Sequence, residues 1–142
     1  MTTSLIKPLY TARATVVGGR DGRAITDDGS LDVAIKPPKE LGGPGEGTNP
    51  EQLFAAGYGS CFQSALSTVA RRQKVETGDS TVECSVTLGT IEGGAFGLAV
   101  NLRVTIPGLD ADTARTLVEA AHAVCPYSNA TRGNVEVTLE VG

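Results

Sequence analysis

The stretch TNPEQLFAAGYGSCFQSALSTVARRQK, residues 48–74, predicts the long helix that organises the fold. Its start is marked in two ways. Thr48 with Glu51 three residues later fits a capping box, in which each side chain bonds the other's backbone amide. Alternatively, Asn49 caps a helix that has Pro50 at its first position. Apolar side chains then recur at helical spacing, at Phe54, Tyr58, Cys61, Phe62, Ala65, Leu66 and Val69.

Strand patterns flank this helix on both sides. Before it, apolar and polar residues alternate at 10–16, and a short run follows at 31–35. After it, two alternating runs at 82–88 and 96–106 are separated by paired glycines, which predicts a hairpin with one buried face. A last alternating run at 135–141 supplies one more strand.

Glycine and proline positions complete the local interpretation. Residues 36–47 carry three Pro and four Gly, so they predict a long loop without periodicity. Gly57 and Gly59 lie inside the long helix and weaken it. They predict either a kink or the close approach of another backbone.

A second helix follows the hairpin. Asp110 is a plausible cap, and apolar residues within 114–124 form one helical face. The helix is expected to end near Cys125, because Pro126 disfavours helical geometry in the residue before it. The order strands, helix, strands, helix, strand predicts an α+β fold with a largely antiparallel sheet, in one domain over residues 1–142.

Composition and charge exclude several function classes. The 142 residues are 40% hydrophobic and 20% charged, which excludes a disordered chain, and no apolar run reaches the ~20 residues of a membrane span. A formal net charge of -4 disfavours nucleic acid and membrane surfaces as partners. Residues 1–10 lack the apolar core of a secretory signal, so we place the protein in the cytoplasm.

The three cysteines differ in context. Their odd number argues against a secreted disulfide scaffold. Cys84 shares its strand alternation with Val82 and Val86, which is typical of a small buried hydrophobe. Cys61 lies on the apolar stripe of the first helix, where a structural role is also typical. Cys125 ends the second helix before a polar loop, where a thiol can be reached. Cys61 and Cys125 meet only if the two helices pack.

Other kinds of site are weakly supported. A metal site is not expected, because no Cys-x-x-Cys pair is present and His122 is the single histidine. His122 could serve Cys61 or Cys125 as the base of a Cys–His acyl-transfer enzyme. Its alternative role is a cation near the C-terminus of the second helix. The glycine-rich turn at 18–22 lacks the following helix of a phosphate-binding loop, so it predicts a hairpin turn.

Two long motifs surround the outer cysteines: TNPEQLFAAGY at residues 48–58, leading to Cys61, and VCPYSNATRGN at residues 124–134. Shorter characteristic segments lie at 9–12, 18–24 and 38–43. Together these segments resemble, in order and over nearly the whole chain, the organic hydroperoxide resistance (Ohr) proteins of the Ohr/OsmC superfamily. The resemblance implies an intertwined α+β homodimer with two active sites at the subunit interface.

The resemblance also implies roles for four residues. Cys61 becomes the peroxidatic cysteine and Cys125 the resolving one, Arg20 the guanidinium that faces the thiolate, and Glu51 the carboxylate that holds Arg20. The implied reaction reduces organic hydroperoxides, including fatty-acid hydroperoxides, to alcohols without a bound cofactor. The implied reductant is the dihydrolipoyl group of a lipoylated protein. Cys84 has no counterpart in the pattern.

Thiol chemistry explains why a cation is needed. Only the thiolate attacks a peroxide, and burial raises the pKa of a cysteine. Cys61 lies about three turns into the predicted helix, beyond the reach of the helix dipole. The guanidinium of Arg20 stays charged when it is desolvated, so it can stabilise the thiolate. Glu51 opposes that stabilisation through its own charge, so its value lies in orienting Arg20.

The substrate preference and one alternative complete the predictions. An apolar pocket lined by Leu41, Phe54 and Phe96 is expected to favour organic hydroperoxides. The alternative function is a redox sensor or a hydrophobic-ligand binding module, switched by a Cys61–Cys125 disulfide.

Overall fold

The structure is a computed structural model that describes residues 2–142, and it divides into two compact units. The first unit extends to Pro50 and the second covers Glu51–Gly142. Each unit is described by itself. The prediction of a single domain over residues 1–142 stays a prediction.

The first unit is a small antiparallel sheet of order β1-β2-β3. Its strands are β1 Ala14–Val17, β2 Gly22–Thr26 and β3 Asp32–Ile35. The loop predicted at 36–47 is present and contains one short 3-10 turn, Lys39–Leu41. Its two ends are joined, because the Lys36 amide donates to the Thr48 carbonyl and the Thr48 amide donates to the Ala34 carbonyl. The loop therefore returns the chain to the edge of β3 before the long helix begins.

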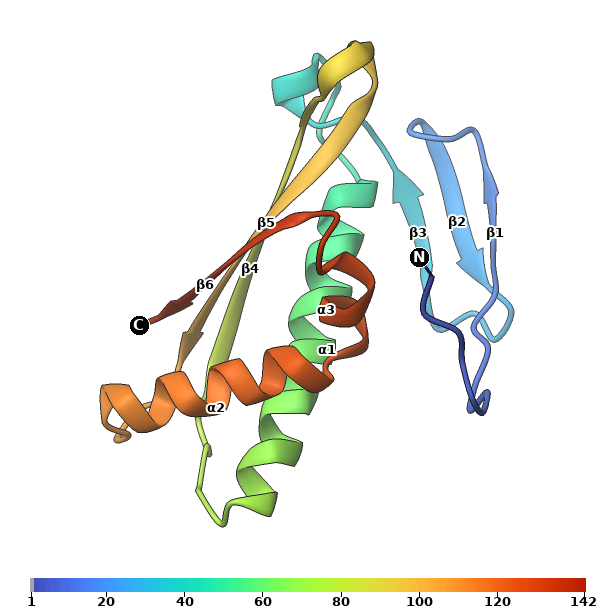
Figure 1. The fold of residues 1–142 in the computed structure, drawn as a ribbon. Coiled ribbons are helices and arrows are strands. Elements are labelled where there is room, and N and C mark those ends of the chain that lie inside the picture. The colour runs from blue at the N-terminus through green and yellow to red at the C-terminus, as the bar shows by residue number, and fades with distance from the viewer. Residues whose placement is uncertain (1) are drawn as a thin grey trace. The chain divides into compact units, whose positions relative to one another are not determined.

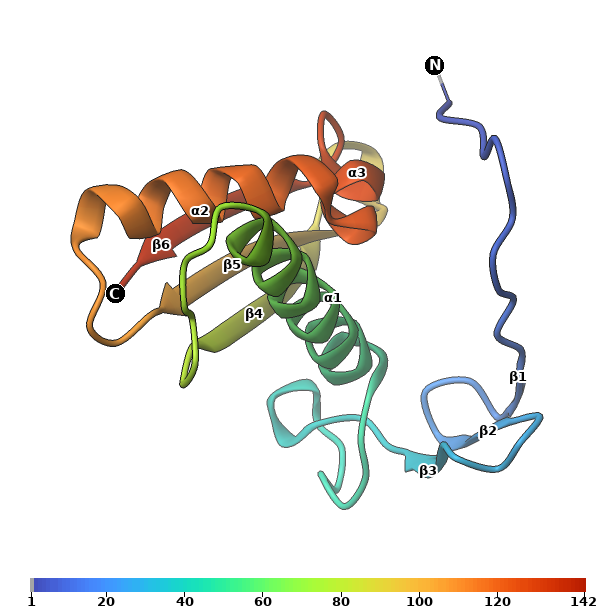
Figure 2. The same cartoon turned by 90° about the horizontal axis from the view of Figure 1, so that it is seen from below.

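The second unit is a three-stranded sheet covered on one face by helices α1 and α2 (Figure 1, Figure 2). Its strands are β4 Thr81–Thr90, β5 Phe96–Thr105 and β6 Glu136–Val141, with a 3-10 turn at Glu92–Gly94. Its helices are α1 Pro50–Arg72, α2 Ala111–Val124 and α3 Pro126–Thr131. The predicted hairpin is the antiparallel pair β4–β5, with Val86 opposite Val100.

Strand β6 lies parallel to β5, with Val137 opposite Val100, so this sheet is mixed rather than purely antiparallel. The helical connection through α2 and α3 returns the chain to the starting end of β5, and such a crossover joins parallel strands. The α+β fold expected from the sequence is confirmed, with this parallel edge as the difference.

The hydrophobic core lies between the helices and the sheet. Alternate residues of β5 enter it, and Leu102 and Val104 are fully buried there. Opposite them, α1 contributes Phe62 and Leu66, while α2 contributes Leu117 and Val118. The opposite face of the sheet is polar, as the strand alternation predicts.

Helix α1 begins at Pro50, which is the register expected for an Asn49 cap position. It runs through Gly57 and Gly59 without interruption. The helix therefore carries Cys61 on a continuous scaffold. The segment after Cys125, predicted as a polar loop, contains the additional helix α3.

Candidate functional site

The structure brings together two of the four predicted site residues, Cys61 and Cys125. Cys61 projects from the middle of α1 and is partly buried, whereas Cys125 joins α2 to α3 and is fully buried. Both are free cysteines, and their side chains are hydrogen-bonded to each other. The two helices therefore pack so that residues distant in sequence become neighbours. A thiol pair in direct contact can form a disulfide with little movement of the backbone.

The surroundings of Cys61 act on its ionisation in opposite directions. Burial is the largest effect and raises the pKa of the Cys61 thiol, and the neighbouring Cys125 raises it further. The backbone amide of Tyr127 donates a hydrogen bond to the sulfur and lowers the pKa. The net shift is upward, so these contacts leave Cys61 mostly as the neutral thiol at neutral pH. A further cationic group is needed to make it an efficient nucleophile.

The Tyr127 amide reaches Cys61 because the chain turns sharply at Cys125. Cys125 has extended backbone angles, φ -64° and ψ 125°, as expected before Pro126. Its amide still donates to the Ala121 carbonyl at 2.9 Å, which closes α2. Its carbonyl accepts from the Asn129 amide at 2.9 Å, which opens α3. One residue therefore ends one helix, starts the next and carries the second thiol.

An aromatic cluster seats α3 on α1. The Tyr127 ring lies 6.1 Å from that of Phe54 and 5.6 Å from that of Tyr58, measured between centroids. The Tyr127 hydroxyl passes directly over Gly57, where an added Cβ would lie 2.7 Å from it. Gly57 therefore permits the close approach of a side chain, whereas the sequence had predicted the approach of a backbone.

Buried hydroxyl groups also join α1 to α3, through Tyr58 of the aromatic cluster. Tyr58 Oη lies 2.8 Å from Ser128 Oγ and 3.2 Å from Thr131 Oγ1. Ser128 Oγ lies 2.8 Å from His122 Nδ1. Among residues 2–142, every buried side-chain nitrogen and oxygen has a hydrogen-bond partner. The polar groups behind the cysteines therefore form a satisfied network.

His122 differs from its predicted role as a helix-terminal cation. Burial, and to a lesser extent the nearby charge of Arg132, lower the pKa of His122, so the imidazole is neutral at pH 7. The cation at the end of α2 is Arg132, whose guanidinium donates to the His122 carbonyl and to Asn129 Oδ1. The Nδ1 atom of His122 contacts Ser128 rather than a thiol.

Arg20 lies in the exposed turn between β1 and β2. The turn requires Gly18, which adopts φ 77° and where a Cβ would lie 2.5 Å from the Asp21 carbonyl oxygen. Asp21 also forms an ion pair with Lys36, with Nζ 2.6 Å from Oδ1. The predicted hairpin turn at 18–22 is therefore present and well defined.

Glu51 lies in the first turn of α1 and is partly buried. Arg20 belongs to the first unit and Glu51 to the second. The predicted pairing of Arg20 with Glu51, and its approach to Cys61, therefore stay predictions.

The chain is similar to known proteins over most of its length. The family model of OsmC-like proteins matches residues 43–140. An organic hydroperoxide resistance protein of Xanthomonas axonopodis pv. citri is 55% identical over 135 residues, which is 94% of each chain. This chain belongs to the Ohr family of OsmC-like proteins. OhrB of Bacillus subtilis, another organic hydroperoxide resistance protein, is 50% identical over 94% of this chain and 98% of its own.

Solved Ohr structures share the fold. The crystal structure of B. subtilis OhrB superposes with a TM-score of 0.88 at 49% identity, covering 95% of this chain and 100% of OhrB. An organic hydroperoxide resistance protein of Legionella pneumophila gives a TM-score of 0.91 at 49% identity, covering 96% of this chain and 99% of its own. These relatives are named for resistance to organic hydroperoxides.

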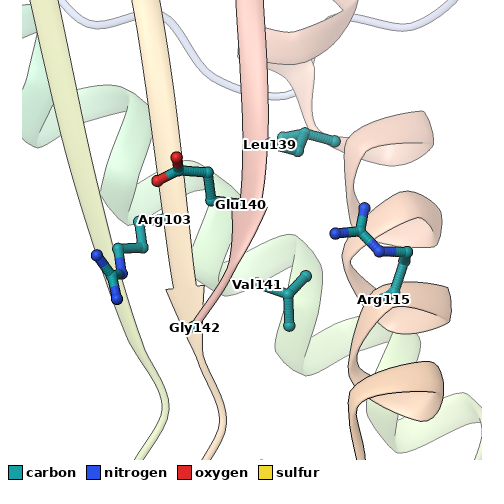
Figure 3. A pocket seen from close by; sticks show the side chains of 6 residues that line it. All are labelled: Arg103, Arg115, Leu139, Glu140, Val141 and Gly142. Atoms are coloured by element: carbon teal, nitrogen blue, oxygen red, sulfur yellow. The ribbon is translucent and has the colours of Figure 1, made fainter.

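Other surface features do not compete with the cysteine pair. Across the described residues, 2–142, no group of three His, Cys, Asp or Glu side chains could hold a metal ion. In the same span no helix is both long and apolar enough to cross a membrane. A shallow pocket beside the end of β6 is lined by Arg103, Arg115 and Glu140 among others and contains no cysteine (Figure 3).

The predicted apolar liners are only partly placed at the site. Phe54 packs on the ring of Tyr127, the residue whose backbone amide bonds Cys61. Leu41 and Phe96 are 57% and 72% exposed on the single chain. Sequence reasoning missed the Tyr127 amide and the buried Tyr58–Ser128–His122 contacts. The sequence feature that points to these contacts is the polar run directly after Cys125 and Pro126, which its composition predicts to be a loop.

Proposed function

We propose that this Ohr-family chain is a thiol peroxidase that reduces organic hydroperoxides to alcohols through Cys61 and Cys125. The observation that carries the proposal is the direct contact of the two thiols, one on a helix and one at the junction of two others. Two cysteines with only a structural role would not need to touch. The names of the family relatives supply the substrate class.

In the first step, the Cys61 thiolate attacks the terminal oxygen of the hydroperoxide. The O–O bond breaks, an S–O bond forms, and the alkoxide leaves as an alcohol after taking up a proton. The sulfur is oxidised by two electrons to a sulfenic acid, and the peroxide is reduced by two. The Tyr127 amide, already bonded to the sulfur, helps to hold the anionic form in place.

In the second step, the Cys125 thiol condenses with the Cys61 sulfenic acid. An S–S bond forms, the S–O bond breaks and one water molecule leaves. This step therefore needs no external oxidant or reductant. A dithiol then reduces the disulfide by thiol–disulfide exchange and is itself oxidised to a disulfide. We propose that this dithiol is a dihydrolipoyl group of a lipoylated protein.

Arg20 and Glu51 complete the proposed site. The contacts around Cys61 raise its pKa, so the reaction requires a cation that the second unit's described contacts do not supply. Arg20 is the residue that the family resemblance assigns to this role, and Glu51 would orient its guanidinium. Fatty-acid hydroperoxides fit the apolar surroundings that Phe54 provides.

We further propose a homodimer in the cytoplasm. The described N-terminal segment exposes Leu5, Ile6, Leu9 and Tyr10 at 81%, 103%, 88% and 84% of their surfaces. Contiguous exposed apolar side chains of this kind mark an interaction surface. A second copy of the chain would cover it. Three free cysteines are consistent with a reducing compartment.

The experiment that tests the function measures the consumption of cumene hydroperoxide with excess dihydrolipoamide. We expect Cys61→Ser to abolish turnover. Cys84→Ser is the matched control and should keep it, because Cys84 forms no disulfide and burial raises its pKa. Wild-type activity in Cys61→Ser would overturn the proposal. A redox sensor or ligand-binding module would instead react once and show no sustained loss of peroxide.

A further inference from the structure

The buried hydroxyl network behind the cysteines has one arrangement of hydrogens that satisfies every contact. Thr131 Oγ1 lies 3.2 Å from the Ser128 carbonyl oxygen and donates its hydrogen there. At the contact between Tyr58 and Thr131, Tyr58 must therefore be the donor. With its hydrogen used, the Tyr58 hydroxyl accepts from Ser128 Oγ. Ser128 in turn accepts from the Nδ1–H of His122.

The reverse orientation of these hydrogens leaves one of the contacts without a hydrogen. If His122 Nδ1 accepted from Ser128, then Ser128 would accept from Tyr58. The hydroxyls of Tyr58 and Thr131 would then face each other with no hydrogen between them. The network therefore selects the Nδ1–H tautomer of His122, an assignment made from hydrogen-bond balance. A protonated imidazole also carries Nδ1–H, so the chain of bonds does not depend on the charge of His122.

Ser128 is the residue where this network meets the reactive site. It is 0% exposed, and its hydroxyl bonds to Tyr58 of α1 and His122 of α2. It follows Tyr127 directly and lies in the same short helix that Cys125 opens. Because α3 is a single short helix, a shift of Ser128 carries Tyr127 and Cys125 with it.

We propose that Ser128 is a positioning residue: its two hydrogen bonds lock α3 between α1 and α2, and thereby hold the Tyr127 amide and the Cys125 thiol against Cys61. The inference rests on the proposed function, since it describes how the thiol pair is aligned for disulfide formation. Ser128 does not touch the reacting sulfur. It acts through the backbone of the helix that it anchors.

Two measurements test the role. The first is the pH dependence of alkylation of Cys61, followed by peptide mass spectrometry, which reports its thiol pKa. The second is the rate of Cys61–Cys125 disulfide formation after one equivalent of cumene hydroperoxide. We expect Ser128→Ala to change the Cys61 pKa, because both the Tyr127 amide and the Cys125 thiol move away from the sulfur. We also expect it to slow disulfide formation by about 10- to 100-fold, the loss typical of a small misplacement of reacting groups.

Asp110→Ala is the matched control. It removes the side-chain cap of α2, where Asp110 accepts from the Thr113 amide at 3.0 Å, and so lowers stability without touching α3. We expect its Cys61 pKa and disulfide rate to equal those of the wild type. Tyr58→Phe is the second variant, because it removes one hydroxyl and keeps the ring and the Ser128–His122 bond. Its effects should have the same direction and be smaller.

The outcomes separate the two proposals. If the wild type forms no Cys61–Cys125 disulfide, the proposed function is wrong, and the alkylation measurement still tests the positioning. If the wild type forms the disulfide while Ser128→Ala and Tyr58→Phe match Asp110→Ala in both measurements, the positioning role is wrong. If Ser128→Ala does not fold, the comparison of Tyr58→Phe with Asp110→Ala decides the question.

Discussion

At the scale of single residues, the chemistry of Cys61 is a balance between burial and polar contacts. Burial raises the pKa of the thiol, Cys125 adds to the effect, and the Tyr127 amide opposes it. Reaction through the thiolate must therefore become faster as the pH rises toward the pKa of Cys61. A cation at the site moves that rise to lower pH. This is the role we assign to Arg20.

Arg20→Ala should shift the pH dependence of Cys61 alkylation upward and slow its oxidation by hydroperoxide about 100-fold at pH 7, which corresponds to about two pKa units. The reason is the loss of the charge that stabilises the thiolate. Stopped-flow oxidation and alkylation across a pH series would measure both effects. Arg115→Ala removes an exposed arginine that lines the pocket beside β6 and serves as the control. Equal alkylation profiles in the two variants would contradict the ion-pair argument.

At the scale of elements, the seam between α1 and α3 decides the geometry of the site. Tyr127 packs on Phe54 and Tyr58 and passes over Gly57. Gly59 lies only two residues further along the same helix but faces Cys84, where an added Cβ would lie at an ordinary contact distance of 3.6 Å. The two glycines are thus alike in sequence and different in surroundings.

Gly59→Ala should stabilise the protein by about 0.5–1 kcal/mol, because alanine favours the helix and meets no clash. Gly57→Ala should gain less, since its Cβ would lie 2.7 Å from the Tyr127 hydroxyl and the ring must move. That movement should also change the alkylation rate of Cys61, whereas Gly59→Ala should not. Urea unfolding measures the stability of the two variants, and alkylation kinetics measure the reactivity of Cys61 in each. Identical behaviour of the two variants would refute the close approach as a constraint.

At the scale of the whole molecule, the exposed apolar side chains require explanation. All four residues of β1 are exposed, and the N-terminal segment adds Leu5, Ile6, Leu9 and Tyr10. Burial of a leucine or isoleucine side chain is worth about 1.5–3 kcal/mol. Covering several of these side chains with a partner surface therefore stabilises the complex by much more free energy than one surface hydrogen bond supplies.

We expect the wild-type chain to sediment at twice its own mass over a wide range of concentrations. The double variant Ile6→Ser, Leu9→Ser should dissociate at higher concentration, because it removes apolar area from the proposed interface. Sedimentation velocity across a dilution series measures the difference. A wild-type chain that sediments as a monomer throughout would rule out the dimer.

Local patterns predict the hairpin β4–β5 and the capped helix α2, and they leave two neighbouring positions for the start of α1, because caps, turns and periodicity are properties of neighbouring residues. The sequence also identified the family through the motifs around Cys61 and Cys125. Three features appear only once the chain is folded: the two thiols touch, β6 lies parallel to β5, and the Tyr127 amide bonds Cys61. These features depend on the packing of elements that are far apart in the sequence. The sequence also does not indicate which group a given backbone amide will contact.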